Sequence, residues 1–133
     1  MRYLLDTDIC IYITKQRPAG PRARLERLRP GDVAMSVITY SELLYGAWKS
    51  QSVEANLAII DRLRSLIPVL PADSDMAEHY GRLRAALEKK GRPIGAYDML
   101  IAAHALSRRL ILVTNNAGEF SRVEGLRLEN WVD

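Results

Sequence analysis

Several features that define whole classes of protein are missing from this chain of 133 residues. It has a single cysteine, Cys10, which excludes an internal disulfide and argues against a small disulfide-stapled fold. No apolar run reaches the roughly 18 to 20 residues that a membrane-spanning helix needs. The opening MRYLLDTD is interrupted by Asp6 and has no small-residue cleavage site after it, unlike a signal peptide. We therefore expect a cytoplasmic protein.

The chain also lacks internal repeats, linkers and low-complexity segments, so we expect residues 1–133 to form one domain. Hydrophobic residues make up 48% and charged residues 26%, as in soluble globular proteins. The net charge is 19 − 16 = +3, and it is unevenly distributed. Residues 1–30 hold seven basic and three acidic side chains, whereas residues 31–133 hold 12 and 13. This basic first quarter is a mild indication of a nucleic-acid partner.

Apolar patterning predicts strands that alternate with helices. We expect strands over residues 2–5, 33–36, 67–70, 110–113 and 126–128, and helices over residues 9–15, 39–48, 56–66, 72–90 and 97–108. Residues 18–21 contain Pro18, Gly20 and Pro21 and predict a turn, which is followed by a short arginine-rich helix. Strands that are almost continuously apolar are typical of a parallel sheet with both faces covered. The predicted fold is α/β, with a mostly parallel central sheet of four to five strands.

Three acidic residues lie where such a sheet places its functional site, outside the carboxyl ends of its strands. Asp6 ends the first strand, Glu42 lies one turn into the helix after the second, and Asp98 opens the helix before the fourth. Carboxylates brought together raise one another's pKa unless a cation lies among them. Oxygen ligands without histidine or cysteine suit Mg²⁺ better than Zn²⁺. Such a site can activate water for in-line displacement at phosphorus.

Each of these acids also has a purely structural interpretation. Thr39 and Glu42 match the T-x-x-E capping box, which on its own favours a helix cap over a metal ligand. Asp98 would stabilise a helix N-terminus through the helix dipole, and Asp8 would suit the N-cap of the first helix. Asp6 is different, because an acid directly after a buried strand is a poor extension of a core. We therefore favour a functional role for Asp6 most strongly.

Other candidate residues favour structural roles or remain balanced between alternatives. Both histidines, His79 and His104, are interpreted as structural or surface residues, and Cys10 as a small buried residue with nothing nearby to activate its thiol. Three cations are candidates for phosphate contact, with ordinary solvated charge as the equal alternative: Lys15, Arg17 and Arg92.

Four separated segments, in order along the whole chain, resemble the PIN-domain endoribonucleases of the VapC toxin family: YLLDTDICIYI, SVITYSELLYGAWKS, GRPIGAYDMLIAAHAL and LVTNNAGEFSRVEGLRLENW. The resemblance implies a three-layer α/β/α sandwich and a metal-dependent ribonuclease. It implies the toxin of a bacterial or archaeal toxin–antitoxin pair, which cuts RNA, often tRNA. It also implies a homodimer that is inhibited by its antitoxin.

Carried over by position, the resemblance makes Asp6, Glu42 and Asp98 the catalytic residues and the ligands of Mg²⁺, with Mn²⁺ as a substitute. The fourth acidic position of the wider PIN group falls in the T-N-N segment, where this chain has Asn116. Either the amide oxygen of Asn116 fills that position or Glu119 supplies the missing charge. Three further residues are candidate additions to the site: Thr7, Asp8 and Thr114.

Two other protein classes share part of this pattern. Haloacid dehalogenase-type phosphatases have a D-x-D after a strand, as in Asp6-Thr7-Asp8, and use the first aspartate as nucleophile. They also need an acidic pair after a late strand, where this chain reads TNNAGEF. Receiver-type signalling domains need an aspartate at the end of the third strand, where this chain continues Leu70-Pro71-Ala72. The phosphatase is the stronger alternative to a ribonuclease.

Overall fold

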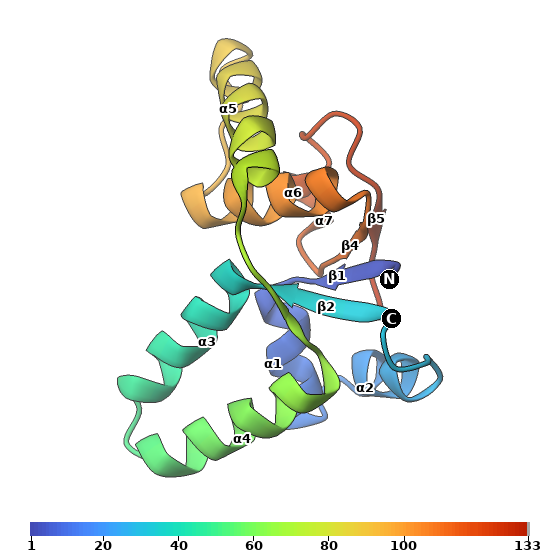
Figure 1. Cartoon of the computed structure of the whole chain (residues 1–133), viewed down its shortest axis with the longest axis vertical. Helices are drawn as coiled ribbons and strands as arrows, with labels where there is room; N and C mark the ends of the chain where they lie inside the picture. The colour runs from blue at the N-terminus through green and yellow to red at the C-terminus, as the bar shows by residue number, and fades with distance from the viewer. Residues whose placement is uncertain (133) are drawn as a thin grey trace.

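The computed structural model describes residues 1–132 and has a five-stranded parallel sheet at its centre (Figure 1). The strand order is β3-β2-β1-β4-β5, and every neighbouring pair is parallel. The strands are β1 (Tyr3–Leu5), β2 (Val33–Ser36), β3 (Val69–Leu70), β4 (Ile111–Val113) and β5 (Leu128–Glu129). The chain adds β2 and β3 on one side of β1 and then β4 and β5 on the other. The carboxyl end of β1 therefore lies at the point where the strand order reverses, which is where open parallel sheets bind ligands.

Seven helices cover the two faces of this sheet in the described part of the chain. They are α1 (Thr7–Lys15), α2 (Ala19–Glu26), α3 (Val37–Trp48), α4 (Val53–Leu66), α5 (Ser74–Lys89), α6 (Ala96–Arg108) and α7 (Ala117–Phe120). None of the helices within residues 1–132 combines the length and the apolar character that a membrane crossing requires.

Alternating side chains of β1 divide the interior into two apolar clusters. Leu4 packs with residues of α5 and α6, whereas Tyr3 and Leu5 pack with residues of α1, α3 and α4. Figure 1 shows α5 and α6 on one side of the strands and α1 and α4 on the other. Strands with apolar side chains on both faces require this double cover. The predicted α/β/α sandwich with a parallel sheet is confirmed.

Some predicted boundaries are wrong, for identifiable local reasons. Helix α1 begins at Thr7 rather than at residue 9, because Asp6 already has extended backbone and caps the helix. Residues 18–21 are not a turn, since α2 starts at Ala19 and holds Pro21 in its first turn, where a missing backbone N–H costs nothing. The last strand lies at residues 128–129 instead of 126–128. The single-turn helix α7 was not predicted.

The buried His104 connects α6 to the start of α3. Its Nδ1 lies 2.8 Å from Oγ of Ser36, and that oxygen also accepts a hydrogen bond from the backbone N–H of Ile38 at the N-terminus of α3. His104 is therefore structural, in agreement with the prediction. Burial lowers the pKa of His104, Arg108 lowers it further, and Asp73 opposes the shift.

This lowered pKa predicts that His104 destabilises the fold in acid. The imidazole of the unfolded chain binds a proton below about pH 6.5, whereas the buried imidazole of the folded chain resists protonation. The free energy of unfolding therefore decreases as the pH is lowered through this range. We expect the difference in unfolding free energy between the natural protein and His104→Leu to be largest near pH 8 and to shrink toward pH 5. Urea denaturation across this range measures it, with His79→Leu as the surface control. A difference that stays constant with pH would contradict the prediction.

Candidate active site

The acids predicted from the sequence converge at the carboxyl end of β1. Asp6 follows β1 directly, Glu42 comes from α3, and Asp98 from the first turn of α6. The carboxyl group of Asp98 lies close enough to those of Glu42, Asp8 and Glu119 for each to raise its pKa. Glu42 and Asp98 line one hollow of about 390 Å³. Residues distant in the sequence thus form a single acidic centre.

Asp6 is the buried member of this centre, with only 5% of its surface exposed. Its Oδ1 accepts a hydrogen bond of 2.8 Å from the backbone N–H of Thr7, and its Oδ2 accepts one of 2.7 Å from the Thr114 hydroxyl. Burial raises the pKa of Asp6 to about 7, and the nearby charges of Asp8 and Asp98 add to the shift. The two hydrogen bonds favour the charged form but offset only part of it.

Glu42 is held toward α1 rather than toward the start of its own helix. The Thr7 hydroxyl donates a hydrogen bond of 2.7 Å to Oε1 of Glu42, and it also lies 3.2 Å from the hydroxyl of Thr39. The capping-box interpretation of Glu42 is therefore wrong. Ser36 caps α3, so the helix begins at Val37 and Thr39 lies inside it. This displacement leaves the Glu42 carboxylate free to face the other acids.

Asp98 lies in the first turn of α6, where the helix-dipole interpretation places it. Gly95 is the N-cap of α6, and no side chain makes a capping hydrogen bond there. Asp98 is half-buried, and its pKa is raised to about 6, first by burial and then by the charges of Glu119 and Glu42. The carboxyl group of Glu119 therefore lies near that of Asp98. These contacts show a carboxyl group directed into the acidic centre.

Glu119 brings a further carboxylate to the place where the chain has Asn116 instead of an acid. The side-chain amide of Asn116 donates a hydrogen bond of 3.2 Å to Oε2 of Glu119, and its backbone N–H donates one of 2.9 Å to Oγ1 of Thr114. Glu119 lies in α7, and this one-turn helix carries it back toward Asp98. The two alternatives for the fourth position are therefore linked, since Asn116 holds Glu119 in place.

Asp8 fixes the loop between β4 and α7. Its interpretation as an N-cap is wrong, because Asp6 occupies that position and Asp8 lies in the first turn of α1. Asp8 Oδ1 accepts a hydrogen bond of 2.7 Å from the backbone N–H of Ile9, and Oδ2 accepts one of 3.2 Å from that of Asn115. The Asn115 side chain in turn bonds to Tyr12 and Asn130. No direct signal in the sequence pointed to this role of Asn115 beyond its place in the T-N-N segment.

The centre suits a divalent cation bound through oxygen. Its polar atoms are carboxylate, amide and hydroxyl oxygens. Burial, and after it the charges of neighbouring acids, raises the pKa values of Asp6 and Asp98. Across residues 1–132, no three acidic, histidine or cysteine side chains already stand in a ligating arrangement. Mg²⁺ commonly binds through one or two carboxylates and keeps several waters, so it does not require three protein ligands that are already in place.

The three candidate cations lie at different distances from the acids. Lys15 shares a hollow between α1, α3 and α4 with Glu42, and Arg92 is exposed in the turn that leads into α6. Arg17 lies beyond the C-terminal end of α1, a helix length from Asp6. The arginines of α2 lie still farther along the chain, and Arg24 binds Glu129 and lies over Trp131. Part of the basic first quarter thus holds the C-terminal segment.

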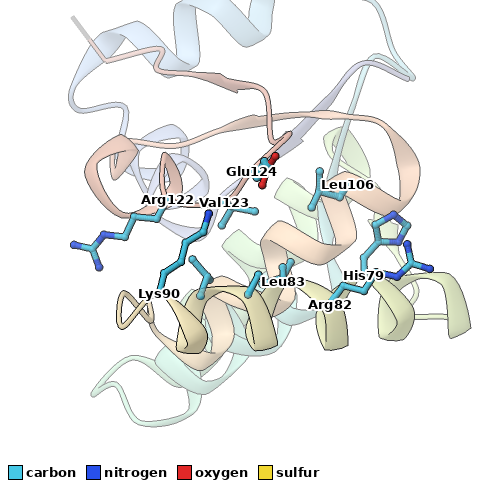
Figure 2. A pocket seen from close by; sticks show the side chains of 10 residues that line it. His79, Arg82, Leu83, Lys90, Leu106, Arg122, Val123 and Glu124 are labelled. Atoms are coloured by element: carbon cyan, nitrogen blue, oxygen red, sulfur yellow. The ribbon is translucent and has the colours of Figure 1, made fainter.

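A groove of about 290 Å³ lies elsewhere, between α5 and residues 122–124 (Figure 2). Its apolar lining includes Leu83, Leu106 and Val123, and its basic residues include Lys90 and Arg122. Figure 2 shows the Arg122 guanidinium directed away from these apolar side chains. None of the acids of the centre at β1 lines this groove. The groove and the acidic centre are therefore separate features.

Comparisons with known proteins agree over nearly the whole chain. A family model described as PIN domain matches residues 3–126. The chain is 50% identical over 131 residues to the tRNA(fMet)-specific endonuclease VapC of Shigella flexneri, covering 98% of both. It matches DNA-bound VapBC from Salmonella typhimurium with a TM-score of 0.93 and 44% identity, covering 98% of both chains. It also matches VapBC-5 of Mycobacterium tuberculosis, a member of the VapBC family of toxin-antitoxin systems, with a TM-score of 0.73 and 29% identity, covering 97% of this chain and 96% of that one.

The raised pKa of Asp6 predicts that this residue destabilises the metal-free fold above neutral pH. A carboxyl whose pKa is higher in the folded chain stabilises the fold at low pH, and this contribution is lost as pH rises through about 7. We expect Asp6→Asn in EDTA to be more stable than the natural protein at pH 8, on the order of 1–3 kcal/mol, and to lose that advantage near pH 4. Chemical denaturation measures this. Asp61→Asn on the exposed face of α4 is the control, and an Asp6→Asn protein that is less stable at pH 8 would count against the shift.

The contact between Asp8 and Asn115 predicts that Asp8 rigidifies the β4–α7 loop. We expect amides 115–120 to exchange hydrogen about tenfold faster in Asp8→Ala, because a charge-assisted hydrogen bond to the loop is lost. Hydrogen-exchange mass spectrometry measures this, with Asp75→Ala in the first turn of α5 as the matched control. Unchanged exchange in the loop of a folded Asp8→Ala protein would show that the contact holds nothing in place.

Proposed function

This chain belongs to the PIN-domain family, and from that premise we propose that it is a divalent-metal-dependent endoribonuclease of the VapC type. The observation that carries the proposal is the acidic centre at the carboxyl end of β1. Its two most perturbed carboxyls, Asp6 and Asp98, have pKa values raised to about 7 and about 6 by burial and by neighbouring acids. Such a cluster is poised to bind a cation, and a cation among carboxylates is suited to phosphodiester hydrolysis.

We assign the roles in the site from these contacts. Asp6 and Asp98 would hold Mg²⁺, or Mn²⁺ in its place, and Glu42 would help to hold it or orient the attacking water. When bound, the cation supplies Lewis-acid activation of water and neutralises charge at the phosphate. Two hydroxyls position the carboxylates, that of Thr114 on Asp6 and that of Thr7 on Glu42.

The β4–α7 loop completes the proposed site. Glu119 supplies the fourth acidic group, and Asn116 orients it through the hydrogen bond of 3.2 Å between their side chains. Asp8 holds the loop through the backbone N–H of Asn115. Water then attacks the phosphorus atom, and one bridging P–O bond of the RNA breaks. For contact with the flanking phosphates we propose Lys15 and Arg92, with Arg17 as the most remote candidate.

The similar proteins indicate the substrate and the partners. A relative that is 50% identical over 98% of the chain is named for specific cleavage of tRNA(fMet), so we propose initiator tRNA as the substrate. Both solved structures reported above are of VapBC proteins, and one of them is described as a member of the VapBC family of toxin-antitoxin systems, so we propose inhibition by a cognate antitoxin. We further propose that residues 1–133 form a single PIN domain, that the protein is a homodimer, and that it acts on RNA in the cytoplasm.

The phosphatase alternative finds no support. The β4–α7 loop carries Asn115 and Asn116 where such a phosphatase has its acidic pair. Asp6, which would be the nucleophile, is 5% exposed and has both carboxylate oxygens engaged in hydrogen bonds within the protein. The similar proteins reported above are an endonuclease and VapBC complexes.

The proposal predicts metal-dependent cleavage that requires the acidic centre. We expect the natural protein to cleave an initiator-tRNA transcript in Mg²⁺ or Mn²⁺, and not in EDTA. Asp6→Asn and Asp98→Asn should each lower the single-turnover rate by about 100-fold or more, since each removes a charged ligand of the proposed cation. Glu119→Gln should lower it less, and Asp61→Asn on α4 should leave it unchanged. Cleavage that persists in EDTA, or in a folded Asp6→Asn protein, would refute the proposal.

A further inference from the structure

Tyr97 is an aromatic residue without a partner beside the acidic centre. Of the six tyrosines of the chain, the other five each contact another side chain, namely Tyr3 with Trp131, Tyr12 with Asn115, Tyr40 with Arg64, Tyr45 with Lys49 and Tyr80 with Arg84. Within the part of the chain that the structure describes, no side-chain hydrogen bond, ring pair or cation over the ring involves Tyr97. The residue is 61% exposed. A large apolar ring in this position is available to a ligand.

The position of Tyr97 links this free ring to the reacting groups. It is the second residue of α6 and directly precedes Asp98. It lines the same hollow of about 390 Å³ as Glu42 and Asp98, together with the small residues Gly95 and Ala96. A Cβ atom at Gly95 would lie 3.5 Å from Oδ2 of Asp98, so any side chain there would begin to cover the carboxylate. Because Gly95 has no side chain, the hollow stays open between the backbone and the acids.

The charge of the hollow determines what kind of contact an RNA substrate can make there. Carboxylates repel the phosphates of RNA, so attraction that does not depend on charge is needed beside them. Aromatic side chains provide it, because unpaired bases stack on them whatever the base. A phosphate that reaches Asp98 brings its own nucleosides within reach of the adjacent residue in the chain.

We propose that Tyr97 is a base-stacking residue that holds the unpaired nucleobase next to the scissile phosphate. This inference rests on the proposed ribonuclease function and specifies how its site binds single-stranded RNA. The occupant of the hollow is then a nucleobase of the substrate, because the hollow is continuous with the residues that would act on the phosphate. A second copy of the chain is the competing occupant, and the test below separates the two.

The test compares Tyr97→Leu with Tyr97→Phe and Tyr97→Trp. The control is Tyr45→Leu, which removes an exposed tyrosine from α3. Steady-state cleavage of an initiator-tRNA transcript gives KM and kcat. Fluorescence anisotropy of the labelled transcript gives Kd in an Asp6→Asn background that does not cleave it. Light scattering gives the mass of each variant.

We expect Tyr97→Leu to raise Kd and KM by about tenfold, the size of one lost base stack, with little change in kcat. The phenylalanine and tryptophan variants should stay within about threefold of the parent, since both keep an aromatic face. The salt dependence of Kd should not change, because no charge is removed. Tyr45→Leu should behave as the parent does.

Three results would overturn the inference. Tyr97→Leu could bind RNA as tightly as the parent, Tyr97→Phe could lose as much affinity as Tyr97→Leu, or Tyr97→Leu could halve the mass of the protein in solution. The last would make Tyr97 a contact between two copies. A parent protein that does not cleave the transcript in Mg²⁺ or Mn²⁺ would instead refute the proposed function, and the two failures are therefore distinguishable.

Discussion

The burial of carboxylates beside one another is the constraint on which the rest of this site depends. Asp6 is almost fully buried beside Asp8 and Asp98, and Glu42 and Glu119 lie near Asp98, so the fold must hold negative charge where water screens it poorly. The fold offsets part of this cost with hydroxyl and backbone N–H donors. Helices α1, α3 and α6 also begin beside the centre, with the positive ends of their dipoles near the acids. The remaining charge is what the proposed cation would offset.

The architecture explains why these groups can be held so closely. The central strand β1 is followed by Asp6, and its neighbours β2 and β4 deliver α3 and the β4–α7 loop to the same end of the sheet. Apolar clusters on both faces fix these elements. Behind the site, the contact between His104 and Ser36 ties α6 to the start of α3. The core thus sets where the backbone of each acidic residue lies, and the hydrogen bonds set the orientation of each carboxylate.

The sequence was sufficient for the sheet, most helices and the acid that ends the first strand, because these depend on patterns that are local in the chain. The capping-box pattern at Glu42 was misleading, since the choice between Ser36 and Thr39 as the cap depends on where β2 stops. The sequence left Asn116 and Glu119 as alternatives, although their side chains bond to each other, because the one-turn helix α7 has too few residues to show a period. No sequence pattern distinguishes Tyr97 from the other tyrosines, since only the structure shows that its side chain has no partner.

The proposed chemistry requires a divalent cation bound among the acids at the end of β1, and crystals grown with Mn²⁺ test this most directly. The anomalous difference map is predicted to show a peak within bonding distance of an oxygen of Asp6 or Asp98, about 2 Å for an ion of this class. The same peak should be absent from crystals of Asp6→Asn grown in the same solution. A natural protein with no peak at this site, or with its Mn²⁺ bound elsewhere, would contradict the account.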